Sequence, residues 1–233
     1  TLAQRAIKGV FWSYFTYVWR RLLNFLVTVV LARILVPEDF GLVAFAILII
    51  SFLNAIEGFG INDALVYTST DVERSAETAF SINIALGILQ FLIAFLIAPL
   101  AVLFFDDPRI VEILRVLSLT FIFDSLGKTH DALLKKELLF KKSALPEIVA
   151  NAIKGLVSVG MVLLGFGVWS IVVGQVVSSL AKAIAKWVAL GWIPQFRFYI
   201  DSAKALWNYG MHVLVFSLLN IALEQADQLF IAT

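Results

Sequence analysis

The sequence predicts an all-α fold that crosses a membrane several times, a polytopic integral membrane protein. Of its 233 residues, 61% are hydrophobic and only 15% are charged, whereas soluble domains have about 45–50% apolar and about 25% charged residues. The apolar residues also come in continuous runs, where the strands of a membrane barrel would alternate over about ten residues. Helices and closed barrels are the structures that satisfy their backbone hydrogen bonds inside lipid, so continuous runs favour helices.

Seven spans are expected, because a helix needs about 20 mainly apolar residues to cross a bilayer. They lie at about 10–35, 40–60, 77–105, 110–127, 144–165, 167–190 and 209–231. The third is the clearest, since no charged residue lies between Glu77 and Asp106. The fifth and sixth are separated at Gly165-Phe166-Gly167, which is typical of a tight turn. The alternative is one long helix with polar ends.

Basic residues indicate the orientation of the spans. With a cytoplasmic N-terminus, ten basic residues fall in cytoplasmic segments and two in external ones, which is a strong positive-inside bias. The ten are Arg5, Lys8, Arg74, Lys128, Lys135, Lys136, Lys141, Lys142, Arg197 and Lys204; the two are Arg33 and Arg109. The stretch LLKKELLFKK (133–142) is expected either to lie along the inner interface, among membrane lipids, or to form an ordinary basic loop.

We expect the chain to be part of a longer protein. It begins without an initiator methionine, and DQLFIAT (227–233) stops at the close of a hydrophobic span. The seventh span would also lack a hairpin partner.

Several function classes are excluded by composition and by missing motifs. The chain has no cysteine, hence no disulfide framework or thiolate metal site, and its net charge of +1 gives no reason to expect nucleic acid. The nucleotide-binding G-x-x-x-x-G-K-[ST], the zinc-binding HExxH and the nucleophile motif GxSxG are all missing. We therefore expect neither an enzyme nor a cofactor or metal site.

Polar residues inside the spans recur at intervals of three and four, which places them on one face of each helix. Span 1 carries Ser13, Tyr17, Arg20, Asn24 and Thr28, with Arg21 beside them; span 5 carries Glu147, Asn151, Lys154 and Ser158; span 6 carries Gln175, Ser179, Lys182 and Lys186; span 7 carries Asn220, Glu224 and Asp227. Spans 2 and 4 add Asn54, Glu57, Arg115 and Asp124, the last two on different sides of span 4.

These stripes predict a shared polar cavity. A charge near the bilayer centre costs about 2.5–3.5 kcal/mol on insertion scales, so stripes that face one another, or face water, are cheaper than stripes that face lipid. Taken one at a time, the residues also fit snorkelling side chains or structural ion pairs. Spans 1, 5 and 6 are mainly cationic, which suits an anionic substrate, and arginine suits phosphate because its planar fork binds two oxygens.

Several segments resemble the polysaccharide transporters of the MOP (multidrug/oligosaccharidyl-lipid/polysaccharide) superfamily, the Wzx-type flippases. The similar segments are LARILVPEDFGLVAFAI (31–47), GINDALV (60–66), FFDDPRI (104–110), ALLKKELLFKKSAL (132–145), GFGVWSIVVGQ (165–175) and YGMHVLVFSLLNIALEQADQLFI (209–231). The resemblance implies a MOP-type bundle of 12 or 14 helices in two lobes. Residues 1–191 would form the N-terminal lobe, 192–208 a cytoplasmic interlobe linker, and 209–233 the first helix of the second lobe.

The resemblance also implies a function in the cytoplasmic (inner) membrane. The cargo would be an undecaprenyl-diphosphate-linked oligosaccharide, moved by alternating access for O-antigen, capsule or exopolysaccharide synthesis, with polysaccharide polymerase and chain-length machinery as possible partners. Arg20, Arg21, Lys154, Lys182 and Lys186 would contact diphosphate or acidic sugars, Asn24, Asn54, Asn151 and Gln175 would bind hydroxyls, and Glu57 or Asp124 would couple an ion. Two alternatives remain: a multidrug/cation antiporter of the same superfamily, and a membrane scaffold of a polysaccharide assembly complex without transport.

Overall fold

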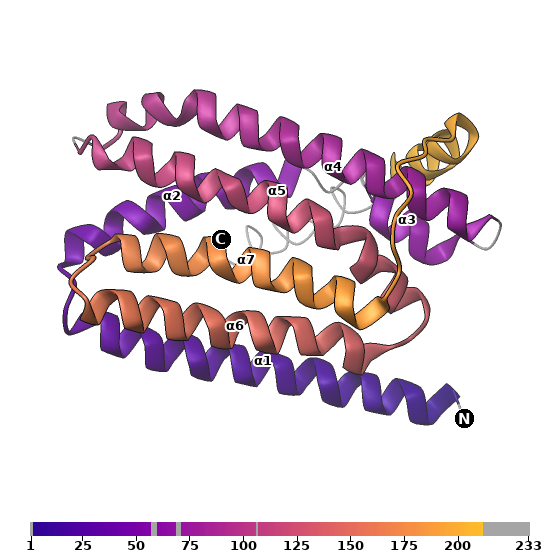
Figure 1. Ribbon diagram of the computed structural model, residues 1–233, viewed down its shortest axis with the longest axis horizontal. Helices are drawn as coiled ribbons and strands as arrows, with labels where there is room; N and C mark the ends of the chain where they lie inside the picture. Colours follow the sequence, from indigo (N-terminus) through magenta and orange to yellow (C-terminus); the bar gives the residue numbers. More distant parts are fainter. Residues whose placement is uncertain (1, 57–59, 69–70, 106, 212–233) are drawn as a thin grey trace, which may run out of the picture.

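The computed structural model describes residues 2–56, 60–68, 71–105 and 107–211, and these form a bundle of helices (Figure 1). In chain order the elements are α1 (Leu2–Ala32), α2 (Pro37–Ile56), α3 (Ile61–Tyr67), α4 (Val72–Ile97), the short 3-10 helix η1 (Ala98–Leu103), α5 (Arg109–Lys136), α6 (Phe140–Leu163) and α7 (Trp169–Leu190). Residues 191–199 have no regular structure, and 200–211 form a further helix. The described part contains no strand, which confirms the all-α prediction.

The long helices lie side by side along the bundle, with α5 between α4 and α7 (Figure 1). The chief packing pairs are α1 with α6, α6 with α7, α7 with α5, and α5 with α4, while α2 and α3 also contact α5. The two ends of α5 define the two ends of the molecule. We call the end with the α5–α6 connection the basic end, after Lys135, Lys136, Lys141 and Lys142. The opposite end, where α5 begins at Arg109, we call the clasp end.

Five helical segments are long and apolar enough to cross a membrane: 14–32, 37–54, 72–103, 140–163 and 169–190. They correspond to predicted spans 1, 2, 3, 5 and 6, and they confirm a polytopic membrane protein. The predicted seventh span, 209–231, lies almost entirely outside the described residues.

Helix α5, predicted as a span over 110–127, does not qualify by composition. It carries Glu112, Arg115 and Asp124 in that stretch, yet half of its residues are buried, because α2, α4 and α7 pack around it. Protein contacts take the place of lipid, so the central helix does not need an apolar surface.

The predicted break between spans 5 and 6 is confirmed. Helix α6 ends at Leu163 and α7 begins at Trp169. Gly165 and Gly167 have φ angles of 84° and 56°, a left-handed conformation that glycine adopts at little cost. One continuous helix is therefore ruled out.

The stretch 133–142 spans the connection between α5 and α6. It is the last turn of α5, a short connection with Leu138 at φ 56°, and the first turn of α6. The Lys136 ammonium donates hydrogen bonds to the carbonyl oxygens of Leu65, Val66 and Thr68 at the end of α3. This lysine, assigned from sequence to topology alone, therefore fastens α3, an element that the sequence analysis missed, to α5.

Candidate functional site: a polar seam between three helices

A row of ion pairs joins α5, α6 and α7 on the half of the bundle nearer the basic end. Lys182 Nζ of α7 lies 3.2 Å from Asp124 Oδ1 of α5 and 4.0 Å from Glu147 Oε1 of α6. Asp124 Oδ1 is buried and accepts no hydrogen bond of good geometry from the described residues, so this pair is held by charge. One turn further along α7, Lys186 Nζ lies 3.4 Å from Asp131 Oδ1. We call these five residues the polar seam.

Asp131 has the most contacts in the seam. Besides Lys186, it pairs with Lys135 (Nζ to Oδ2, 2.9 Å) and accepts a hydrogen bond from Ser143 Oγ (3.2 Å). A polar pocket of about 210 Å³ opens beside it, lined by Asn62, Asp63, Val66, Lys128, Asp131, Ala132, Lys135 and Lys186. The carboxylate therefore joins α5, α6 and α7 at the basic end.

Charges within this network balance. Three carboxylates (Asp124, Asp131 and Glu147) face three ammonium groups (Lys135, Lys182 and Lys186). The Lys186 side chain is only 9% exposed, and an ion this buried is tolerated when it is paired. The pairing therefore explains how α7 carries two lysines in a membrane span.

Lys154 is different. It lies on the same helix as Glu147, in a segment that qualifies as a span, and it is partly buried. Among the described residues no carboxylate lies within ion-pairing distance of its ammonium group, and no hydrogen bond to its side chain is present. Within the described part of α5, α6 and α7, Lys154 is thus a partly buried cation without a counter-charge next to a neutral network. Arg115 of α5 also has no carboxylate partner there, but its guanidinium carbon lies 4.6 Å from the centroid of the Phe95 ring.

Close packing of α6 against α7 fixes the backbone at Lys154. A Cβ atom placed on Gly174 would lie 3.3 Å from the Lys154 carbonyl oxygen and 2.1 Å from Ser158 Oγ. Because glycine has no side chain, the two helices approach to a distance that no other residue at 174 permits.

The amides predicted as sugar contacts are distributed on several helices. Asn151 is partly buried on α6 and donates from Nδ2 to the carbonyl oxygen of Glu147 at 2.6 Å, while Gln175 is partly buried on α7. Asn24 on α1 and Asn54 near the end of α2 are exposed and are not brought into the seam. Glu57, a predicted coupling residue, lies outside the described residues.

The predicted cations of α1 lie on an exposed face. Arg20 and Arg21 place their guanidinium carbons 6.0 Å and 5.4 Å from the centroid of the Tyr17 ring, and Arg21 Nε donates to the Tyr17 hydroxyl at 3.2 Å. Helix α1 packs against α6, where Val27 reaches Gly155. In the described part of the chain Arg20 and Arg21 are exposed and form no ion pair with the polar seam.

Sequence reasoning missed Asp131 and Ser143, assigned Lys135 to topology alone, and placed Glu147 in a polar stripe without naming Lys182 as its partner. The signal was present in the spacing, since Asp124, Lys128, Asp131 and Lys135 follow one another at intervals of four, three and four residues. It was missed because span 4 was ended at residue 127, whereas α5 runs on to Lys136.

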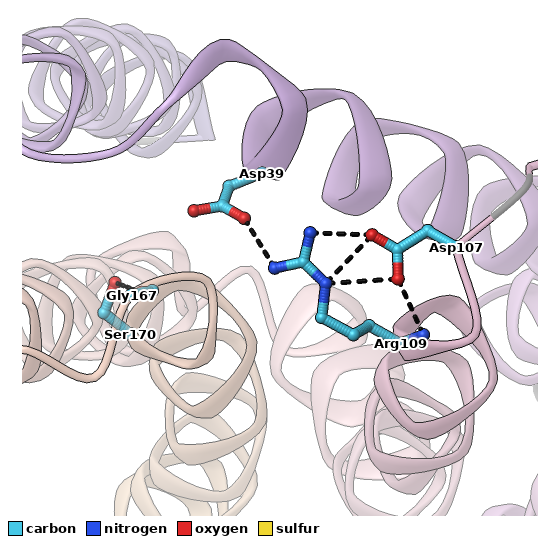
Figure 2. A network of polar contacts seen from close by, with 5 residues as sticks. All are labelled: Asp39, Asp107, Arg109, Gly167 and Ser170. Carbon is cyan, nitrogen blue, oxygen red and sulfur yellow. Dashed lines mark hydrogen bonds and ion pairs between the residues drawn. The ribbon is translucent and has the colours of Figure 1, made fainter.

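At the clasp end, an arginine bridges two carboxylates (Figure 2). Arg109 pairs with Asp107 (Nη2 to Oδ2, 2.7 Å) and with Asp39 of α2 (Nη1 to Oδ1, 3.1 Å), and we call these three residues the clasp. Hydrogen bonds from the Arg109 side chain and backbone hold the pKa of the Asp107 carboxyl below its usual range. Nearby, Ser170 Oγ donates to the Gly167 carbonyl oxygen at 2.7 Å and closes the first turn of α7. The clasp thus joins two of the segments that carry the family resemblance, around Asp39 and around Asp107.

Comparison with known proteins then decides the family. Residues 30–233 match the family described as "Polysaccharide biosynthesis protein". The chain belongs to this family. The resemblance to polysaccharide transporters of the MOP superfamily is thereby confirmed, and the family is transporter-like rather than an enzyme family.

Curated relatives agree with this assignment. The chain is 29% identical to the succinoglycan biosynthesis transport protein ExoT of Rhizobium meliloti. The alignment covers 99% of this chain and 47% of ExoT. This chain is 24% identical over 94% of its length to the lipopolysaccharide biosynthesis protein WzxC of Escherichia coli (45% covered), and 24% over 77% to the teichuronic acid biosynthesis protein TuaB of Bacillus subtilis (38% covered). The chain thus spans about half the length of these relatives or less. No solved structure matches it.

Proposed function

We propose that the whole protein moves an undecaprenyl-diphosphate-linked oligosaccharide across the cytoplasmic membrane, by alternating access, for polysaccharide biosynthesis. The observation that carries the proposal is Lys154, a partly buried cation within a membrane span and beside a charge-balanced network. An unneutralised ammonium group in a bilayer is unfavourable by several kcal/mol, and a diphosphate would remove that penalty on binding. The names of the relatives, which include transport of succinoglycan, support a glycan cargo.

The cations divide into two groups in this proposal. Lys154, with Arg20 and Arg21 of α1, binds the diphosphate, and the arginine forks suit two oxygens at once. Lys182 and Lys186 already hold carboxylates, so their first role is to keep α5, α6 and α7 together. Asp124, which shares Lys182 with Glu147, remains the candidate for ion coupling.

Orientation follows from charge. The basic end collects Lys135, Lys136, Lys141 and Lys142, and positive residues favour the cytoplasmic side. We therefore place the N-terminus and the polar pocket at the cytoplasmic side and the clasp at the external side. Cargo would first meet the cationic pocket at the inner leaflet.

The test is export in cells that lack the endogenous gene and carry the full-length protein. Lys154→Gln is expected to reduce surface polysaccharide at least tenfold at equal protein level in the membrane, and Lys154→Arg to retain most of it. Lys141→Gln is the matched control, because Lys141 is an exposed lysine on the same helix, over the Trp12 ring. Unchanged export by Lys154→Gln would contradict the assignment. Gained drug resistance in exporter-deficient cells, without export, would favour a multidrug antiporter instead.

A further inference from the structure

The segment that follows α7 contacts the bundle at several points along its described length. We call residues 191–211 the strap. Helix α7 ends at Gly191, which adopts φ 69° and donates from its amide to the Trp187 carbonyl oxygen at 2.8 Å. This left-handed residue turns the chain sideways, so that the strap crosses the basic end toward α3 (Figure 1).

Aromatic rings hold the first part of the strap. Phe80 of α4 is fully buried, and the rings around it belong to α5, α7 and the strap. Their centroid distances from Phe80 are 6.3 Å for His130, 6.1 Å for Trp187, 6.2 Å for Trp192 and 5.6 Å for Phe196. His130 stacks on Trp187 at 4.8 Å, and its Nε2 lies 3.1 Å from the Trp192 carbonyl oxygen. The strap is thus tied to three helices at one point.

Polar contacts hold the middle of the strap along α4. The Tyr199 amide donates to Thr78 Oγ1 at 3.2 Å, and the Arg74 guanidinium lies 5.3 Å from the centroid of the Tyr199 ring. Ser81 Oγ donates to the Arg197 carbonyl oxygen at 3.5 Å. The chain therefore follows one face of α4 for two turns.

The helix 200–211 enters the core. Leu206 is 1% exposed and belongs to a cluster with residues of α3, α4 and α5, among them Leu65, Ala76 and Leu133. Tyr209 contacts Tyr67 of α3, with ring centroids 5.8 Å apart. A segment expected from sequence to be a linker over 192–208 thus contributes a core side chain to the N-terminal bundle.

We propose that the strap belongs to the same rigid body as α3, α4 and α5, so that residues 191–211 move with the N-terminal lobe during transport. This inference rests on the proposed function. In alternating access two bodies of the transporter move relative to each other, so the position of the boundary between them along the chain matters. On this view the division between the bodies does not fall within 192–208. The aromatic rings around Phe80, which we call the aromatic cluster, and the buried side chain of Leu206 hold the strap on this body.

Distance measurement between spin labels tests this directly, in the full-length protein in lipid nanodiscs. The chain has no cysteine, so single cysteines introduced into it label specifically once any others in the full-length protein are replaced. The test pair is Glu73→Cys with Lys204→Cys, from α4 to the strap; the control pair is Glu73→Cys with Lys142→Cys, within the bundle. All three positions are exposed. We expect the two distance distributions to be equally narrow. A broad or two-peaked distribution for the test pair, with a narrow one for the control, would overturn the proposal.

Two variants separate this inference from the proposed function. Leu206→Ala is expected to broaden the distribution of the test pair and leave the control pair unchanged, whatever the protein transports. Joining Tyr67→Cys to Tyr209→Cys with a short bismaleimide is expected to leave export within twofold of the unlinked double variant. Loss of export on cross-linking alone would overturn the rigid strap. Absence of export in the wild-type protein would instead refute the proposed function and leave the distance result standing.

Discussion

The close approach of α6 and α7 gives a sharp test of the packing that positions Lys154. In Gly174→Ala the new Cβ would lie 2.1 Å from Ser158 Oγ and 3.3 Å from both Ser158 Cβ and the Lys154 carbonyl oxygen. Real Cβ contacts do not occur at the first distance, so the serine must rotate or the helices must separate. Overpacking of this kind costs about 1–3 kcal/mol.

Alanine also gains about 1 kcal/mol over glycine in a helix interior, and this gain has to be removed from the comparison. Gly160→Ala on α6 is the matched control, because a Cβ there would meet nothing within 4 Å. Both variants share the helix gain, so their difference isolates the packing cost. Gly174→Ala is expected to be less stable than Gly160→Ala by about 1–3 kcal/mol, measured as denaturant unfolding in detergent.

A third variant identifies the clashing group. In a Ser158→Ala background the shortest contact is lost, so the difference between Gly174→Ala and Gly160→Ala should shrink by half or more. Equal stability of Gly174→Ala and Gly160→Ala in the wild-type background would refute the reasoning. A difference that Ser158→Ala leaves unchanged would show that Ser158 is not the group that clashes.

Three further predictions concern charge and the aromatic cluster. Asp131→Asn is expected to lower the free energy of unfolding by about 3–5 kcal/mol, because it leaves the buried ammonium of Lys186 without a counter-charge. Lys186→Met should lower it less, since Asp131 keeps its other partners. Denaturant unfolding measures both. Phe80→Ala is expected to cost about 3–5 kcal/mol by the loss of a buried aromatic side chain, seen in the same assay. Asp107→Asn should lower the melting temperature at pH 7, and this difference from wild type should shrink only as the pH falls below about 3.9, because a carboxylate with a lowered pKa stabilises the fold fully above its usual pKa and loses this effect as it becomes protonated in the folded protein.

Each of these has a contrary outcome. If Asp131→Asn and Lys186→Met lowered the free energy of unfolding equally, Asp131 would not be stabilising more than one cation. An unchanged stability of Phe80→Ala would contradict the packing of the strap. A deficit of Asp107→Asn that does not shrink as the pH falls below about 3.9 would show that ionisation of this carboxylate is not its cause.

Much of the fold was predictable because the bilayer imposes strong local rules. Continuous apolar runs predicted the five helices that qualify as spans, and Gly165 and Gly167 predicted the break between two of them. Helix α5 was harder, since its neighbours bury it and its composition resembles that of a soluble helix. The short α3 has seven residues and no periodic signal, and it is held by contacts from Lys136 that are distant in sequence.

The candidate site was predictable in part, for a similar reason. Periodicity places Lys182 and Lys186 on one face of a helix, but it carries no information on which residue of another helix stands opposite. The pairing of Lys182 with Asp124 depends on the axial shift between α5 and α7, which is set by tertiary packing. For that reason five cations looked equivalent in the sequence, whereas the fold neutralises Lys182 and Lys186, exposes Arg20 and Arg21, and leaves Lys154 partly buried without a counter-charge.

The most direct test of the account is leaflet-to-leaflet movement by the full-length protein in vesicles, with a fluorescent polyprenyl-diphosphate oligosaccharide as cargo. We predict that the wild-type protein moves this lipid, that Lys154→Arg keeps most of the rate, and that Lys154→Gln lowers it at least tenfold. Movement by Lys154→Gln at the wild-type rate would contradict the role given to Lys154, and no movement by the wild-type protein would contradict the proposed function itself.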